Sequence, residues 1–122
     1  MAVSMTMPIL IVDDYNTMIR IVRNLLRQLG FSNIDEATGG DVALAKLRAK
    51  DYALVISDSG MSPMTGRELL ARVRADARTR QTPFVMIGDD AEAAQAGTSA
   101  TIAIPFTAQA LKAKIEPMIG AF

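Results

Sequence analysis

Two short apolar runs that each stop at acidic side chains constrain the fold of this 122-residue chain more than any other feature. Ile9–Val12 is followed by Asp13 and Asp14, and Leu54–Ser57 is followed by Asp58. Aliphatic, largely β-branched runs of this length are typical of buried parallel strands. Such strands deliver the residues after them to the carboxyl edge of a sheet, where ligands bind in open α/β folds. Each Asp alone also fits a turn or a helix cap, but the set together predicts one metal site.

The rest of the chain alternates strand-like and helix-like patterns. The expected strands span residues 8–13, 33–37, 53–58, 82–87 and 101–104. Five strand–helix alternations predict a doubly wound parallel sheet with helices on both faces. We expect the flavodoxin-like strand order 2-1-3-4-5 with five helices. The fourth is short, because residues 91–97 leave room for only about two turns. This order sets the first and third strands side by side and brings the three carboxylates together.

Composition narrows the chemistry. Thirteen Lys and Arg balance thirteen Asp and Glu, so no bulk charge directs the chain to nucleic acid or to acidic membranes. The chain has no Cys and no His, which excludes disulfides, thiol chemistry and imidazole catalysis. A bound metal should therefore be hard and oxygen-ligated, and Mg²⁺ is expected. The length fits one domain over residues 1–122, and the absence of a signal-like or membrane-spanning run predicts a cytoplasmic location.

The motifs around the acidic residues resemble those of the CheY-like receiver domain of two-component signalling. They are Ile11–Met18, Arg23–Leu26, Leu29–Phe31, and Val55–Asp58 followed by Met61, Met64 and Gly66. The resemblance covers essentially the whole chain. It implies a stand-alone response regulator of a chemotaxis-type phosphorelay, whose partners are a histidine kinase or phosphotransfer protein and a downstream protein. It implies no direct contact with nucleic acid and no insertion into a membrane.

The resemblance also implies roles for individual residues. Asp58 is expected to accept the phosphoryl group. Mg²⁺ is expected at the carboxylates of Asp13, Asp14 and Asp58 and at the backbone carbonyl of Gly60, with Asp13 acting through water. A carboxylate can accept a phosphoryl group when a metal neutralises the developing charge. The chain is not expected to be an enzyme beyond self-phosphorylation and self-dephosphorylation.

Three positions depart from the family pattern. Gly88 stands where these domains carry a Thr or Ser hydroxyl, Ile104 where they carry Lys, and Thr101 where they carry an aromatic switch residue. Gly88 still has a backbone N–H to offer, but Ile104 offers no charge. Three carboxylates around Mg²⁺ leave a net charge of about −1, which a phosphoryl group makes more negative. We therefore expect weakened phosphorylation and switching. From sequence alone, the Ile104–Pro105 bond has about a 5% probability of being cis.

Two other functions compete with this reading. In the first, the chain is a phosphorylation-independent pseudo-receiver that acts as an interaction module, which the changes at Gly88 and Ile104 favour. In the second, it is a small phosphatase or nucleotide enzyme. That reading is disfavoured, because the sequence has no Asp-x-Asp nucleophile pair and no Gly-rich phosphate loop.

Overall fold

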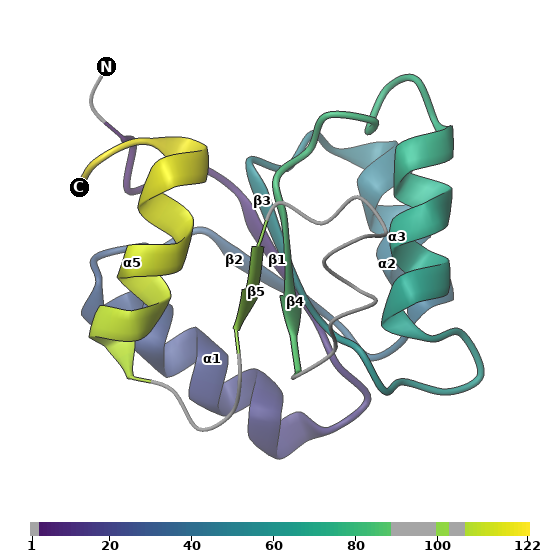
Figure 1. Ribbon diagram of the computed structural model, residues 1–122, viewed down its shortest axis with the longest axis horizontal. Helices are drawn as coiled ribbons and strands as arrows, with labels where there is room; N and C mark the ends of the chain where they lie inside the picture. Colours follow the sequence, from purple (N-terminus) through teal and green to yellow (C-terminus); the bar gives the residue numbers. More distant parts are fainter. Residues whose placement is uncertain (1–2, 89–99, 103–106) are drawn as a thin grey trace.

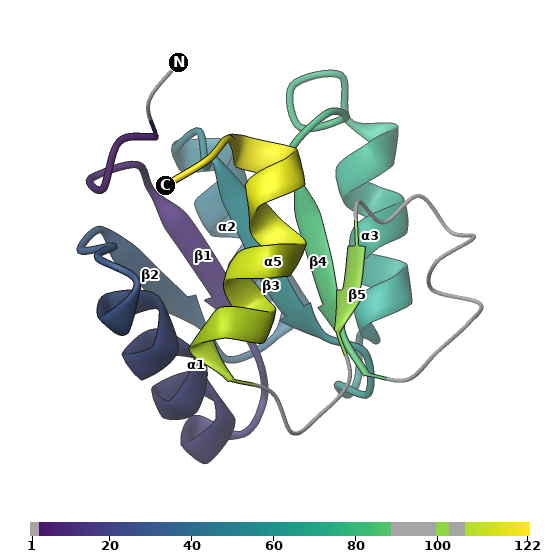
Figure 2. The same cartoon turned by 60° about the vertical axis from the view of Figure 1, so that its left-hand side comes forward.

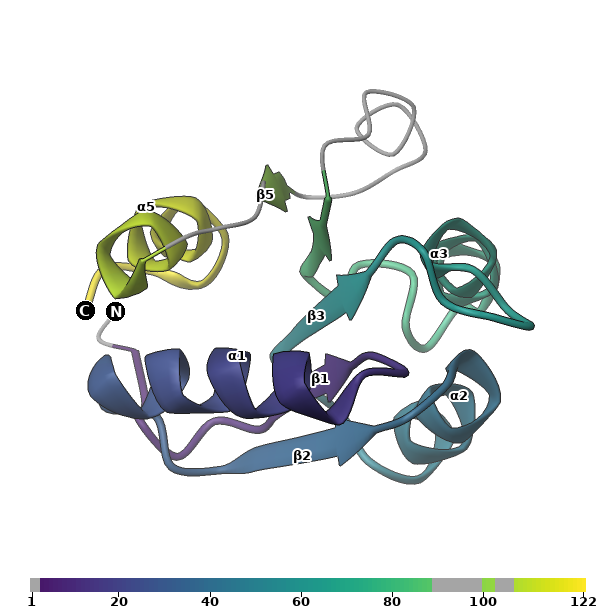
Figure 3. The same cartoon turned by 90° about the horizontal axis from the view of Figure 1, so that it is seen from below.

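A computed structural model describes residues 3–88, 100–102 and 107–122 of the chain. A five-stranded parallel sheet forms its centre, with helices on both faces (Figures 1 and 2). Helices α1 and α5 cover one face, and α2 and α3 cover the other (Figure 3). In chain order the elements are β1 (Ile9–Val12), α1 (Asn16–Gln28), β2 (Ile34–Ala37), α2 (Gly40–Ala49), β3 (Leu54–Asp58), α3 (Gly66–Ala75), β4 (Phe84–Ile87), β5 (Ala100–Ile102) and α5 (Ala108–Ile119).

The strands lie in the order β2-β1-β3-β4-β5, and every neighbouring pair is parallel. This confirms the flavodoxin-like order expected from the sequence. Val12 of β1 pairs with Ser57 of β3, and Asp58 pairs with Ile87 of β4. The chain therefore leaves β1 and β3 at the same edge of the sheet, which is where the acidic residues follow.

The sheet separates two apolar cores. Leu10 and Val12 point toward α2 and α3, whereas Ile9 and Ile11 point toward α1 and α5. All four side chains are at most 1% exposed. Because both faces of β1 are covered, the strand shows an unbroken apolar run with no polar alternation, as expected for a parallel sheet between helical layers.

Local signals in the sequence place the helix ends. Gly30 follows α1 with a φ of 106°, a conformation that glycine adopts without strain. Thr65 caps α3 by accepting a hydrogen bond from the N–H of Glu68, while the Glu68 carboxylate accepts one from the N–H of Thr65. Thr107 caps α5 in a similar way, since its hydroxyl oxygen accepts from the N–H of Ala110. These caps set where α3 and α5 begin relative to the sheet edge.

Four of the five expected helices are present among the described residues, and the expected short fourth helix lies outside them, as does the Ile104–Pro105 bond. In the described part of the chain the cis peptide bond is Ser62–Pro63. No helix within residues 3–88, 100–102 and 107–122 is long and apolar enough to cross a membrane.

Candidate functional site

Three carboxylates meet where β1 and β3 end. Asp13, Asp14 and Asp58 each place one carboxylate oxygen within 4.8 Å of the other two. The register between β1 and β3 produces this, because Val12 lies opposite Ser57 and the residues that follow emerge side by side. Mg²⁺ and Ca²⁺ bind oxygen ligands at about 2.0–2.6 Å, so oxygens this close together can share one cation. The donor set fits the hard metal expected from the sequence.

Asp13 is the most buried member of the set, with 2% of its surface exposed. Its Oδ1 accepts a hydrogen bond from the Tyr15 N–H at 2.9 Å. The pKa of the Asp13 carboxyl is raised from 3.8 to about 6. Burial is the largest cause, the hydrogen bond from the Tyr15 N–H opposes it, and the charges of Asp58 and Asp14 contribute to the rise. Without a cation, the site therefore disfavours the ionised form of Asp13, which a bound cation would stabilise.

Asp58 is half-buried and more accessible than Asp13. Its Oδ2 accepts a hydrogen bond from the Gly60 N–H at 3.3 Å, and its backbone carbonyl accepts one from the Ser57 hydroxyl at 3.0 Å. The bond from Gly60 orients the Asp58 side chain, and the bond from Ser57 holds its backbone at the end of β3. Gly60 therefore contacts Asp58 by donating its N–H to the carboxylate. Metal ligation by the Gly60 carbonyl stays a prediction.

The chain passes very close to Asp58 again at Gly66, the first residue of α3. The Gly66 N–H donates to the carbonyl of Ser59 at 3.1 Å. A Cβ at Gly66 would collide with the carbonyl oxygen of Asp58 and would lie 2.8 Å from the sulfur of Met86. Only a residue without a side chain allows α3 to start here, so Gly66 helps to position the loop that follows Asp58.

A pocket of about 510 Å³ adjoins two of the three carboxylates. It is lined by Asp13, Tyr15, Thr17, Met18 and Asp58. The Tyr15 side chain is 72% exposed. Helical periodicity indicates only that Met18 faces the core, so spacing alone does not reveal that Thr17 and Met18 border the site. A strand followed by a helix N-terminus is the signal that could have identified them.

The positions that depart from the family pattern are only partly described. Gly88 has a φ of 142°, and its N–H donates to the carbonyl of Ile102 at 2.9 Å. The expectation that this N–H is available to a ligand is therefore wrong, because the N–H forms a hydrogen bond that pairs the end of β4 with β5. Thr101 lies in β5 opposite Met86 and is half-buried. Ile104 lies outside the described residues.

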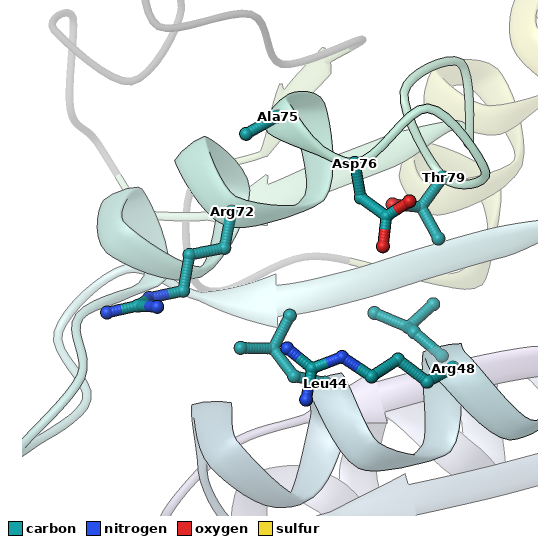
Figure 4. Close-up of a pocket in the computed structure, with 7 residues that line it drawn as sticks. Leu44, Arg48, Arg72, Ala75, Asp76 and Thr79 are labelled. Atoms are coloured by element: carbon teal, nitrogen blue, oxygen red, sulfur yellow. The ribbon is translucent and has the colours of Figure 1, made fainter.

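A second hollow, of about 340 Å³, lies between α2 and α3 (Figure 4). Leu44 and Arg48 come from α2 and Arg72 from α3, and Asp76 and Thr79 border the end of the hollow. It contains none of the three clustered carboxylates. The acidic pocket is therefore the better candidate for phosphoryl and metal chemistry.

Residues 9–116 match the model of the response regulator receiver domain family. The chain belongs to this family of two-component signalling domains. It is 48% identical to chemotaxis protein CheY of Pseudomonas aeruginosa over 116 residues, which covers 90% of this chain and 94% of that protein. It is 47% identical to CheY-3 of Vibrio cholerae, with coverage of 90% and 89%. The chain is thus a receiver domain of the CheY type, as its motifs implied.

Solved structures agree with this fold. CheY4 of Vibrio cholerae superposes with a TM-score of 0.84 at 27% identity, covering 93% of this chain and 98% of that one. The receiver domain of a sensor histidine kinase from Pseudomonas aeruginosa gives a TM-score of 0.86 at 22% identity, with coverage of 95% and 99%. That protein was solved with a magnesium ion coordinated in its active-site cleft.

Proposed function

We propose that this chain is a single-domain response regulator that accepts a phosphoryl group on Asp58 with the help of Mg²⁺. The observation that carries the proposal is the meeting of three carboxylate oxygens within 4.8 Å at the ends of β1 and β3. Asp13, Asp14 and Asp58 would hold the cation, with the Gly60 carbonyl as a further ligand. When bound, the cation supplies positive charge that offsets the repulsion between the carboxylates and an incoming phosphoryl group.

Asp58 is the member of the trio best suited to act as the nucleophile. It is half-buried and lines the open pocket, whereas Asp13 is almost fully buried and the exposed Asp14 does not line the pocket. One Asp58 oxygen would attack the phosphorus atom while the bond from phosphorus to the donor breaks, and the donor leaves with the bonding electron pair. The Gly60 N–H donates to Oδ2, which helps to hold the carboxylate in one orientation.

The phosphoryl donor would be a histidine kinase or phosphotransfer protein, and the output would be contact with a downstream protein. The CheY-type relatives support this assignment, as does a charge balance that favours no nucleic acid. We also propose that the protein is cytoplasmic, that residues 1–122 form one domain, and that the protein does not turn over a separate substrate. The family match over residues 9–116 supports the single domain.

The test is the intact mass of the purified chain after incubation with Mg²⁺ and acetyl phosphate. We expect a mass gain of one phosphoryl group. This gain should be absent when EDTA replaces Mg²⁺ in the incubation, and absent from Asp58→Ala. Asp41→Ala is the matched control, because Asp41 is an exposed carboxylate in the first turn of α2. A chain that binds Mg²⁺ but gains no mass, under conditions that modify an ordinary receiver, would refute phosphoryl acceptance.

The second candidate function is a phosphorylation-independent interaction module. The observation that favours it is the engagement of the Gly88 N–H with Ile102, which leaves position 88 with no donor for a phosphoryl oxygen. Ile104→Lys separates the two functions. A restored ammonium should raise the rate of phosphoryl acceptance about ten- to a hundredfold if Asp58 is a slow acceptor, because one charge-assisted hydrogen bond contributes about 1.5–3 kcal/mol. It should change nothing in a protein that does not use phosphorylation.

A further inference from the structure

Ser59, the residue directly after Asp58, is held firmly by its backbone. Its N–H donates to the carbonyl of Ile87 at 3.2 Å, and its carbonyl accepts from the N–H of Gly66 at 3.1 Å. The residue is half-buried, so its side chain is reachable from the surface. The backbone contacts fix the position of the Ser59 main chain, and therefore of the Cβ that carries the hydroxyl group.

The Ser59 hydroxyl lies against Gly88, at the end of the neighbouring strand β4. A Cβ built at Gly88 would lie 2.5 Å from Ser59 Oγ and 3.4 Å from Ser59 Cβ. Any side chain at position 88 would therefore need the space that the Ser59 hydroxyl occupies. The φ of 142° at Gly88 is also a conformation that residues with a side chain rarely adopt.

The Ser59 hydroxyl has no hydrogen-bond partner within the described parts of the chain, in contrast to Ser57, whose hydroxyl donates to the Asp58 carbonyl. A hydroxyl is both a donor and an acceptor, and it rotates to suit an incoming group. The Gly88 N–H cannot serve instead, because Ile102 accepts it. Among the described residues at this strand end, the Ser59 hydroxyl is therefore a donor that remains open to a ligand.

We propose that Ser59 donates a hydrogen bond to a phosphoryl oxygen on Asp58, and that Gly88 makes room for the Ser59 side chain. This inference rests on the proposed function, since it concerns the phosphorylated form of Asp58. The three carboxylates and the phosphoryl group all carry negative charge, so a donor beside the phosphoryl group makes a charge-assisted hydrogen bond to it. The Gly60 N–H is one such donor, and Ser59 supplies a second from an adjacent position.

Binding of beryllofluoride, a phosphoryl mimic, tests the role of Ser59. We would measure its affinity by ¹⁹F NMR in the presence of Mg²⁺ for the wild type and for Ser59→Ala, Ser59→Thr and Ser62→Ala. Ser62 is the control, because it is an exposed hydroxyl residue in the same loop. We expect Ser59→Ala to weaken binding about tenfold, Ser59→Thr to recover most of it, and Ser62→Ala to leave it unchanged. The Mg²⁺ affinity and the unfolding midpoint should be the same in all four proteins, which a purely structural role would not predict.

The outcomes separate this inference from the proposed function. A wild type that binds Mg²⁺ but neither beryllofluoride nor a phosphoryl group overturns both. A wild type that binds beryllofluoride no more than twofold better than Ser59→Ala overturns only the role of Ser59.

A double-mutant cycle tests the contact between the two strand ends. Gly88→Ala should lower the unfolding midpoint in the wild-type background and lower it less in Ser59→Ala, because the closest atom to the new methyl group is then Cβ at 3.4 Å. Equal effects of Gly88→Ala in the two backgrounds would overturn the steric coupling.

Discussion

Replacing Asp13 by Asn removes a buried charge while preserving the shape of the side chain, and we expect Asp13→Asn to stabilise the metal-free protein. The carboxyl group is 2% exposed and lies beside Asp14 and Asp58. The Asn side-chain oxygen can still accept the hydrogen bond that Asp13 receives from the Tyr15 N–H. The substitution therefore removes burial of charge and repulsion, and it leaves the local turn intact.

The size of the effect follows from the pKa of Asp13, which is raised from 3.8 to about 6. One pKa unit corresponds to about 1.4 kcal/mol, so the charged form costs the folded state up to about 3 kcal/mol at pH 7. Relaxation and the imperfect fit of the amide reduce this, and we expect a gain of about 1–3 kcal/mol. For a domain of this size the melting temperature should rise by about 3–5 °C per kcal/mol.

The dependence on pH has a definite sign. Because the folded-state pKa of Asp13 is raised, the folded protein binds more protons than the unfolded chain between about pH 4 and pH 6. Wild-type stability should therefore increase as the pH falls through this range, and this contribution is lost as the pH rises through about 6. The advantage of Asp13→Asn should be largest at pH 7 and should shrink toward pH 4.

Urea unfolding followed by circular dichroism in EDTA, at pH 7 and at pH 4.5, measures both effects. Asp51→Asn is the control, since Asp51 is an exposed carboxylate paired with Arg78, and its loss should cost no more than about 1 kcal/mol. Added Mg²⁺ should stabilise the wild type more than Asp13→Asn. The reasoning is refuted if Asp13→Asn is no more stable than the wild type at pH 7, or if its advantage is the same at both pH values.

Three further substitutions, one of them with a matched control, test other parts of the structure. Gly66→Ala should lower the free energy of unfolding by about 2–3 kcal/mol in urea titrations, because its methyl group would collide with the backbone. Gly60→Ala should have little effect, since the nearest atom to its methyl group within the described residues is Asp58 Oδ2 at 3.8 Å. Tyr52→Phe removes the hydroxyl that donates to Asp35 at 2.5 Å and should cost about 1 kcal/mol at pH 7. That hydroxyl, more than any other group, holds the pKa of Asp35 below its ordinary value. The difference in free energy of unfolding between the wild type and Tyr52→Phe should therefore fade as the pH drops below about 4. A difference that stays constant with pH would contradict this. Phe122→Ala removes an edge-to-face ring contact at 5.0 Å between centroids, and a fall in melting temperature of about 3–8 °C is expected by calorimetry.

The sequence was most informative where one physical cause acts on many residues at once. Apolar runs without alternation identified the parallel strands, and helical spacing identified the stripe that packs on the sheet. The five strand–helix alternations indicated a doubly wound parallel sheet, for which we expected the strand order 2-1-3-4-5. Together these placed Asp13, Asp14 and Asp58 at one edge, and the 4.8 Å spacing of their oxygens is the close approach that this placement requires.

The sequence was least informative where the outcome depends on a single backbone hydrogen bond. The availability of the Gly88 N–H was predicted wrongly, because nothing in the local residues states that Ile102 accepts it. Likewise, no periodicity reveals that the space beside Gly88 contains the hydroxyl of Ser59. Contacts of this kind arise from the register between β3, β4 and β5, which becomes known only when the strands are placed side by side.

The apolar character of β1, and of β3 from Leu54 to Ile56, has a consequence for how the site tolerates insertions and deletions. A slip of one residue would exchange the side chains between the two cores, and both sets are apolar, so the strands themselves oppose it only weakly. The lengths of the connections to the helices must then set the alignment. Each residue added or lost within a strand would move Asp13 past Asp58 by about 3.3 Å, more than the length of a metal–oxygen bond. The acidic edge should therefore accept many substitutions around it but almost no change in chain length within β1 or β3.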